Sequence, residues 1–181
     1  MKIELKKATI EDAPKWLSMQ AEAYAHIIGI YGEHDFNPAI ETLEKVVSSM
    51  NLPGRENFFI LKDGEDAGAV RISWRNKKLL GFIPQKGKKA YRLGNIFILP
   101  QFRNGGIGQI VMNTLEARYP DAAYWELGTI LQDKRNIYFY EKLGYKRTGK
   151  KKIVNDKLTL VFYKKSMKKP KIFFENILKN A

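Results

Sequence analysis

The sequence IFILPQFRNGGIG occupies residues 96–108 and joins an apolar run, a proline and a glycine-rich loop. The apolar run over residues 93–99 predicts a buried strand that ends at Pro100. A helix is expected from about Gly106 to Arg118. The loop at residues 101–108 therefore lies directly between a strand and a helix, and this position decides what it can bind.

The loop has the composition of an anion-binding site. The first amides of a helix have no internal hydrogen-bond partner, and the helix macrodipole places partial positive charge there. Glycines let the backbone approach an anion closely, and Arg103 adds a full charge, so a pyrophosphate is the natural ligand. Glycine-rich turns also occur without any ligand. The loop is neither a P-loop, because no Gly-Lys-Ser/Thr follows, nor a dinucleotide fingerprint, because the third glycine is missing.

A second segment, NIYFYEKLGY at residues 136–145, follows further along the chain. The first segment resembles motif A of the GCN5-related N-acetyltransferase (GNAT) superfamily, a strand followed by Arg/Gln-x-x-Gly-x-Gly/Ala, here Arg103, Gly106 and Gly108. The second segment resembles motif B of the same superfamily. Together, in this order and at this spacing, the motifs make the chain similar to GNAT proteins over residues 1–165.

The resemblance implies an N-acetyltransferase that uses acetyl-CoA as co-substrate and needs no metal. It implies that the CoA pyrophosphate binds to backbone amides of the loop and that the pantetheine arm pairs with the preceding strand. Phe97 and Ile98 would be buried in any strand, so their role is a backbone role, and Asn136 is also explained as an ordinary first-turn helix residue. The implied CoA-binding residues are Phe97, Ile98, Arg103, Asn104, Gly105, Gly106, Ile107, Gly108 and Asn136.

The resemblance also implies two catalytic residues. Tyr140 matches the tyrosine that acts as general acid on the departing thiolate, a role that suits a phenol because it is neutral at pH 7. Aromatic packing beside Tyr138 and Phe139 is the alternative explanation. Many members carry a glutamate on the strand before motif A, but residues 91–95 contain no carboxylate. Glu126 is the nearest substitute, since a carboxylate in an apolar strand is costly unless it is paired or functional. A solvent-facing position, with water as the base, is the alternative.

The acceptor pocket of this family borders the loop between the first two helices, here residues 30–36. Tyr31, Glu33 and Asp35 combine an aromatic ring with two carboxylates, which suits a cationic amine. We therefore expect a primary amine of a small molecule or peptide as acceptor, attacking the thioester directly. A polar inter-helix loop without such a role explains the same residues.

The rest of the chain predicts an α/β protein with a central mixed, mostly antiparallel sheet and helices on both faces. Helices are expected over residues 9–28, 38–50 and 134–143, and strands over residues 3–8, 57–61, 66–74, 122–127, 145–151 and 157–165. Asp63-Gly64 signals a hairpin. Residues 1–167 are expected to form one GNAT-like domain, and residues 168–181 a basic, amphipathic helical tail that packs on its own domain or on a second copy in a homodimer.

Composition limits the other functions. The chain has 181 residues, no cysteine, two histidines and a net charge of +13. Catalysis by a cysteine thiolate is excluded, and a metal centre is not expected. No membrane span or signal peptide is recognisable, so the cytoplasm is the expected location. Residues 71–92 carry eight basic and no acidic residues, and residues 146–171 eleven basic and one acidic.

Such basic stretches attract CoA, dock RNA or a ribosome, or simply form a solvated surface. Two alternatives to an enzyme therefore stay open: a non-catalytic acyl-CoA-binding regulatory protein, favoured by the missing glutamate, and a nucleic-acid-binding module, favoured by charge alone.

Overall fold

Seven strands form one sheet in the order β1-β2-β3-β4-β5-β7-β6. The computed structural model describes residues 1–31, 37–75 and 89–167. Within this part, β4 and β5 pair in parallel and all other neighbours are antiparallel, which confirms the predicted mixed, mostly antiparallel sheet. The strands are β1 (Ile3–Lys7), β2 (Arg55–Lys62), β3 (Glu65–Arg75), β4 (Lys89–Ile98), β5 (Ala122–Ile130), β6 (Lys146–Ile153) and β7 (Thr159–Ser166).

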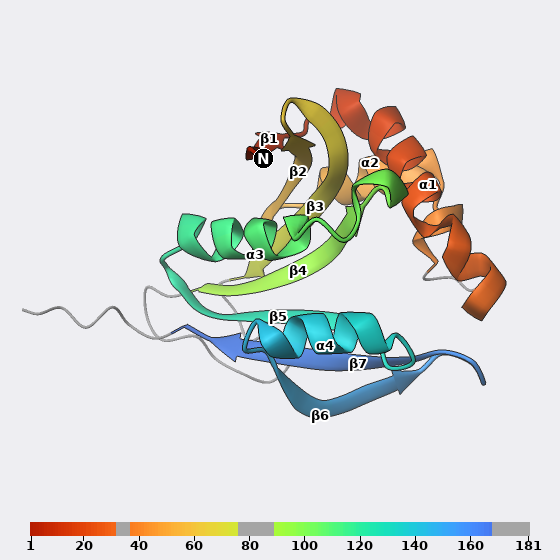
Figure 1. Ribbon diagram of the computed structural model, residues 1–181, viewed down its shortest axis with the longest axis vertical. Coiled ribbons are helices and arrows are strands. Elements are labelled where there is room, and N and C mark those ends of the chain that lie inside the picture. Colours follow the sequence, from red (N-terminus) through yellow and green to blue (C-terminus); the bar gives the residue numbers. More distant parts are fainter. Residues whose placement is uncertain (32–36, 76–88, 168–181) are drawn as a thin grey trace, which may run out of the picture.

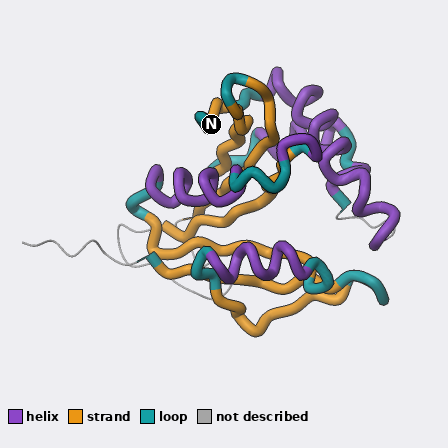
Figure 2. Tube along the Cα trace, in the orientation of Figure 1, coloured by secondary structure: helices purple, strands orange, loops and turns teal. Residues whose placement is uncertain are grey.

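Helices cover both faces of the sheet, as predicted (Figures 1 and 2). On one face, α3 and α4 bury side chains against alternate residues of the strands, such as Ile72 and Trp125. On the other, α1 and α2 cover Phe59, Ala69 and Phe97. The α-helices are α1 (Ala13–Tyr31), α2 (Leu43–Met50), α3 (Ile107–Arg118) and α4 (Lys134–Lys142), and the short 3₁₀ turns are η1 (Ile10–Asp12), η2 (Pro38–Ile40) and η3 (Pro100–Phe102).

Local sequence signals explain most element boundaries. The Thr9 amide donates to the Asp12 carboxylate at 2.9 Å, which forms the expected capping box, but a 3₁₀ turn precedes α1. Asp63 and Gly64 both have positive φ angles, 51° and 92°, as the turn of a two-residue hairpin requires. The helix expected from Pro38 is interrupted, because Thr42 accepts a hydrogen bond from the Lys45 amide and starts α2 anew.

Parts of the predictions fall outside the described residues. The tail at residues 168–181 and most of the first basic stretch, residues 76–88, belong to this group. The predicted domain boundary at residue 167 therefore stays a prediction. The second basic stretch falls on β6 and β7, and most side chains of the outer strand β6 are exposed. No helix of residues 1–31, 37–75 and 89–167 is long and apolar enough to cross a membrane.

Candidate acetyl-CoA cleft and active site

The parallel strands β4 and β5 diverge and open a cleft in the sheet. Their pairing runs from Lys89 opposite Ala122 to Arg92 opposite Glu126 and then stops. Beyond this row, β4 stays paired with β3 as far as Ile98, and β5 continues along β7. The edge of β4 at residues 93–98 consequently faces a cleft of about 1250 Å³ instead of a strand. An extended molecule with amide groups fits such an edge, because it can complete the interrupted sheet.

The glycine-rich loop closes one end of this cleft. Asn104 and Gly106 have positive φ angles of 69° and 75°, and they turn the chain from η3 into α3. Gly106 precedes the first residue of α3, and no side chain caps this helix end. Asn104, Gly106, Ile107 and Gly108 line the cleft, so the N-terminus of α3 opens into it. This arrangement has the backbone amides that an anion site needs, and anion binding by the loop stays a prediction.

Two arginines hold the loop in place. The Arg103 guanidinium donates to the Ile98 carbonyl at 3.0 Å and to the Ala23 carbonyl at 2.6 Å, which ties the loop to β4 and α1. Arg135 donates to the Asn104 side-chain oxygen at 2.7 Å and ties the loop to α4. The sequence analysis missed Arg135. A signal was present, because a basic residue in the first turn of a helix opposes the macrodipole and is unfavourable for the helix itself.

The CoA-binding roles of Phe97, Ile98 and Asn136 stay predictions. All three line the cleft. The Phe97 ring is buried and packs edge-on against Trp16, with the ring centroids 5.7 Å apart. Asn136 lies in the first turn of α4, where its amide donates to the Asp133 carboxylate at 3.0 Å, and its own side chain is exposed.

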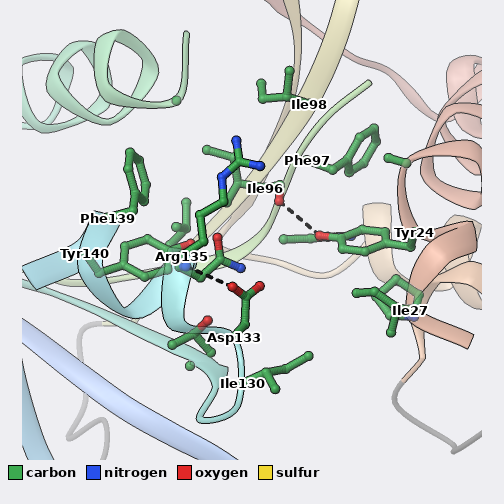
Figure 3. A pocket seen from close by; sticks show the side chains of 18 of the residues that line it. Tyr24, Ile27, Ile96, Phe97, Ile98, Ile130, Asp133, Arg135, Phe139 and Tyr140 are labelled. Carbon is green, nitrogen blue, oxygen red and sulfur yellow. Dashed lines mark hydrogen bonds between the residues drawn. The ribbon is translucent and has the colours of Figure 1, made fainter. Parts of the chain in front are cut away.

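Two tyrosines face each other across the cleft (Figure 3). Tyr140 points into it from α4, and burial raises the pKa of its phenol above the usual value. Tyr24 points into it from α1, and its hydroxyl lies 3.0 Å from the Ile96 carbonyl and 2.5 Å from the Asn95 side-chain oxygen. Tyr140 also packs edge-on against Tyr145 at 6.1 Å, so the packing explanation and the catalytic one are compatible. No sequence pattern pointed to Tyr24, because an aromatic residue in an amphipathic helix is usually a core residue.

The acceptor side is described in part. Tyr31 lines the cleft at the end of α1, where the Asn155 side-chain amide donates to its carbonyl at 3.3 Å. Glu33 and Asp35 lie outside the described residues. Glu41 is a carboxylate that the sequence analysis did not single out; it lines the cleft and accepts a hydrogen bond from Gln20 at 2.7 Å.

Glu126 lies at the base of the cleft, on the sheet face that α1 and α2 cover. It is fully buried, and neither carboxylate oxygen has a hydrogen-bond partner among the described residues. Burial raises its pKa, while Lys164 and Arg92 lower it in part. Glu126 is not itself a lining residue, but its cross-strand neighbour Arg92 and its same-face neighbour Gly128 are.

Comparisons with known proteins agree with this geometry. The family model of the acetyltransferase (GNAT) domain matches residues 54–147. The chain belongs to the GNAT acetyltransferase family. It is also 31% identical over 148 residues to the uncharacterised protein YrkN of Bacillus subtilis (strain 168), a match that covers 80% of this chain and 73% of YrkN.

Two solved structures of acetyltransferases show the same fold. The PaiA N-acetyltransferase of Thermoplasma acidophilum, solved in complex with coenzyme A, superposes with a TM-score of 0.66 at 18% identity, over 92% of this chain and 100% of that one. The ribosomal-protein-S18-alanine N-acetyltransferase of Escherichia coli superposes with a TM-score of 0.66 at 15% identity, over 96% and 100%.

This GNAT protein is an acetyl-CoA-dependent N-acetyltransferase, as the sequence predicted. The motif A loop, the β4 edge and the first turn of α4 form one continuous lining, which fits the phosphates and the extended arm of CoA. Among the described residues, no three histidine, aspartate or glutamate side chains gather as a metal site would require.

Proposed function

We propose that this GNAT acetyltransferase transfers the acetyl group to a primary amine of a small molecule or peptide, by direct attack of the amine on the thioester. When bound, acetyl-CoA supplies the activated acyl group. The observation that carries the proposal is the position of Tyr140: its phenol points into the cleft where β4 and β5 diverge, across from Tyr24 (Figure 3).

Tyr140 is proposed as the general acid that protonates the departing sulfur. Its raised pKa keeps the phenol protonated at neutral pH, so it can donate a hydrogen bond and its proton to the sulfur as negative charge develops there. The Tyr24 hydroxyl is already engaged with Ile96 and Asn95, which fixes the β4 edge and leaves Tyr140 as the donor.

Glu126 is proposed to accept the proton that the amine loses, through water that enters from the cleft beside Arg92 and Gly128. Burial raises the pKa of its carboxyl, and a carboxyl with a raised pKa is a more effective base than an ordinary one. The amine itself would lie on the α1 side, near Tyr31, and Glu33 and Asp35 stay predicted to bind it.

The test is acetyl-CoA turnover, followed as free thiol, on a panel of amines, amino sugars and peptides, with mass spectrometry to locate the acetyl group. Acceptor-dependent thiol release with acetyl on nitrogen is the expected result. Tight CoA binding without turnover on any acceptor would instead support a non-catalytic, acyl-CoA-binding regulatory protein.

A further inference from the structure

A row of polar side chains crosses the sheet on the acceptor side of the cleft. Asn57 of β2 pairs with Arg71 of β3, and Arg71 pairs with Asn95 of β4. The neighbouring row on the same face, Phe59, Ala69 and Phe97, is apolar and covered by α1. An arginine in the middle of a sheet therefore requires an explanation.

Arg71 is almost fully buried and incompletely paired. Its side chain is 7% exposed, and its Nε donates to the Asn57 side-chain oxygen at 2.8 Å. Its guanidinium carbon lies 5.1 Å from the Trp16 ring centroid. Its Nη2 has no hydrogen-bond partner among the residues that the structure describes. Arg71 lines the cleft, so an occupant of the cleft can supply the partner that the protein does not.

Desolvation does not remove the charge. Burial lowers the pKa of Arg71 to about 10, while Glu41 opposes this shift. The group is therefore still cationic at neutral pH. Within the described residues Arg71 makes no ion pair shorter than 4 Å, and a buried charge without such a pair is costly unless a further partner binds it.

Asn37 provides a second unpartnered donor on the same cleft. It is 3% exposed, and its side-chain oxygen accepts from the Ala39 amide at 3.0 Å, which fixes the orientation of its amide group. Its Nδ2 has no hydrogen-bond partner in the described part of the chain. Both unpartnered atoms are donors, so both call for an oxygen acceptor rather than a cationic group.

Hydrogen bonds connect the two donors to one region. Gln20 donates to the carbonyl of Pro38, the residue after Asn37, at 2.8 Å. The Gln20 side-chain oxygen accepts from Asn95, the cross-strand neighbour of Arg71, at 2.8 Å. The segment that carries Asn37 is thus fastened beside the row that carries Arg71.

The surrounding charge is also positive. Lys45, Arg55 and Arg92 line the cleft from α2, β2 and β4, against Glu41 on that side. These cations lie away from the motif A loop, which follows the far end of β4 and precedes α3 on the opposite face. The loop and Arg135 are proposed to bind the CoA phosphates, whereas the positive charge around Arg71 favours a second anion.

We infer that the acceptor carries an oxyanion, a carboxylate or a phosphate, in addition to its amine, and that Arg71 and Asn37 bind this oxyanion. The inference rests on the proposed function, because it specifies the acceptor of that same reaction. Binding of the acceptor's oxyanion then holds its amine at a fixed distance from the thioester, and amines of similar shape without the oxyanion are poor acceptors.

Matched acceptor pairs test this inference. One arm compares free amino acids with their amides, and a second arm compares glucosamine 6-phosphate with glucosamine. We expect the anionic member of at least one arm to have a kcat/KM about ten- to a hundred-fold higher, the range for a hydrogen-bonded charged group. The arm that responds identifies carboxylate or phosphate as the source of the charge.

Variants assign the effect to Arg71. Arg71→Gln should abolish the preference mainly through KM, and Arg71→Lys should restore part of it. Arg118→Gln, which removes a cation of α3 outside the cleft, should leave the preference intact. Unchanged CoA affinity of Arg71→Gln shows that this variant is folded.

The outcomes separate the inference from the proposed function. Acetylation of neutral and anionic amines with equal kcat/KM would overturn the inference and leave amine acetylation standing. Absence of any acetylation would overturn the proposed function. Calorimetry with the same acceptor pairs and the CoA-loaded protein then tests the oxyanion site by itself. Binding of an anionic member that depends on Arg71 supports the site, and no binding of either anionic member overturns it.

Discussion

At the scale of single residues, Tyr140 is both a core residue and a candidate acid. Replacing it with phenylalanine retains the ring that packs against Tyr145 and removes only the hydroxyl. We expect Tyr140→Phe to lower kcat by about a hundred-fold or more, the usual contribution of a general acid, with little change in melting temperature or CoA affinity. Stopped-flow thiol release measures this effect, and an unchanged kcat would remove Tyr140 from the mechanism.

Tyr140 also predicts a pH profile. Its pKa lies above the usual value of 10, chiefly because the phenol is buried. An acid with a raised pKa keeps its proton at higher pH, so loss of this proton should cause no decrease in kcat at any pH up to 10. An alkaline fall that Tyr140→Phe abolishes would contradict the assignment.

Glu126 predicts opposite effects on activity and stability. Its pKa is higher in the folded protein than in the unfolded chain, so the folded state holds the proton more tightly, and stability falls as the pH rises above the unfolded value. Glu126→Gln removes an unsatisfied buried carboxylate and should stabilise the fold by about 1 kcal/mol at pH 8, with no gain at pH 4. It should also slow acetyl transfer.

Calorimetry at the two pH values measures the stability change. Glu4→Gln is a suitable control, because Glu4 is an exposed residue of β1 that pairs with Lys2 and does not line the cleft. A gain of stability without loss of activity would leave Glu126 as a purely structural feature.

These residues also show which parts of the candidate site can be predicted from the sequence. Arg103, Asn136 and Tyr140 could be singled out as candidates because each occupies a fixed position in a short motif, and the spacing within a motif can be read from the sequence. Tyr24, Asn37 and Arg71 were not found, because they lie on elements that read as ordinary core or turn. Their meeting depends on which strand pairs with which and on how η2 packs against α1.

At the scale of elements, substitution of Gly106 tests whether the motif A loop binds the CoA phosphates. It has a φ of 75° at the start of α3, and Gly149 has a φ of 80° in β6; an added Cβ meets no atom within 4 Å at either site. Alanine at either position should therefore cost about 1 kcal/mol of backbone strain. Only Gly106→Ala should also weaken CoA binding, by about ten-fold, because its Cβ projects where a phosphate approaches the amides.

The Gly149→Ala variant isolates this second effect. Equal melting temperatures and unequal CoA affinities, measured by thermal denaturation and calorimetry, would locate the phosphates at the motif A loop. Equal affinities would place them elsewhere.

The element boundaries were predicted well where a capping side chain or a turn glycine ends or begins an element. The hairpin at Asp63-Gly64 and the start of α4 after Asp133 follow this rule. The split of the second predicted helix was missed, since its cause is a competition between two caps, at Asn37 and at Thr42, that the hydrophobic pattern does not reveal.

At the scale of the whole molecule, the open sheet predicts that CoA binding stabilises the protein. At a CoA concentration 100 times the Kd, linkage gives about 2.7 kcal/mol, or roughly 5–10 °C for a domain of this size. Hydrogen exchange should slow at residues 93–98 of β4, while β1, which lies far from the cleft in the sheet order, should not change. Stabilisation without slower exchange at residues 93–98 would exclude binding along this edge.

The short junction between β4 and β5 has a consequence for how the chain folds during synthesis. Everything up to α3 leaves the ribosome first and can assemble as β1 to β4, and the remaining three strands join it through four pairs of residues, the first of them Lys89 with Ala122. These contacts close a longer loop than the β2–β3 hairpin does, so they form later than the hairpin. We expect them to open first as well. In native-state hydrogen exchange without ligand, amides at residues 89–92 should therefore exchange through a lower-energy opening than those of the β2–β3 hairpin, and equal opening energies would show that the sheet folds as a single unit.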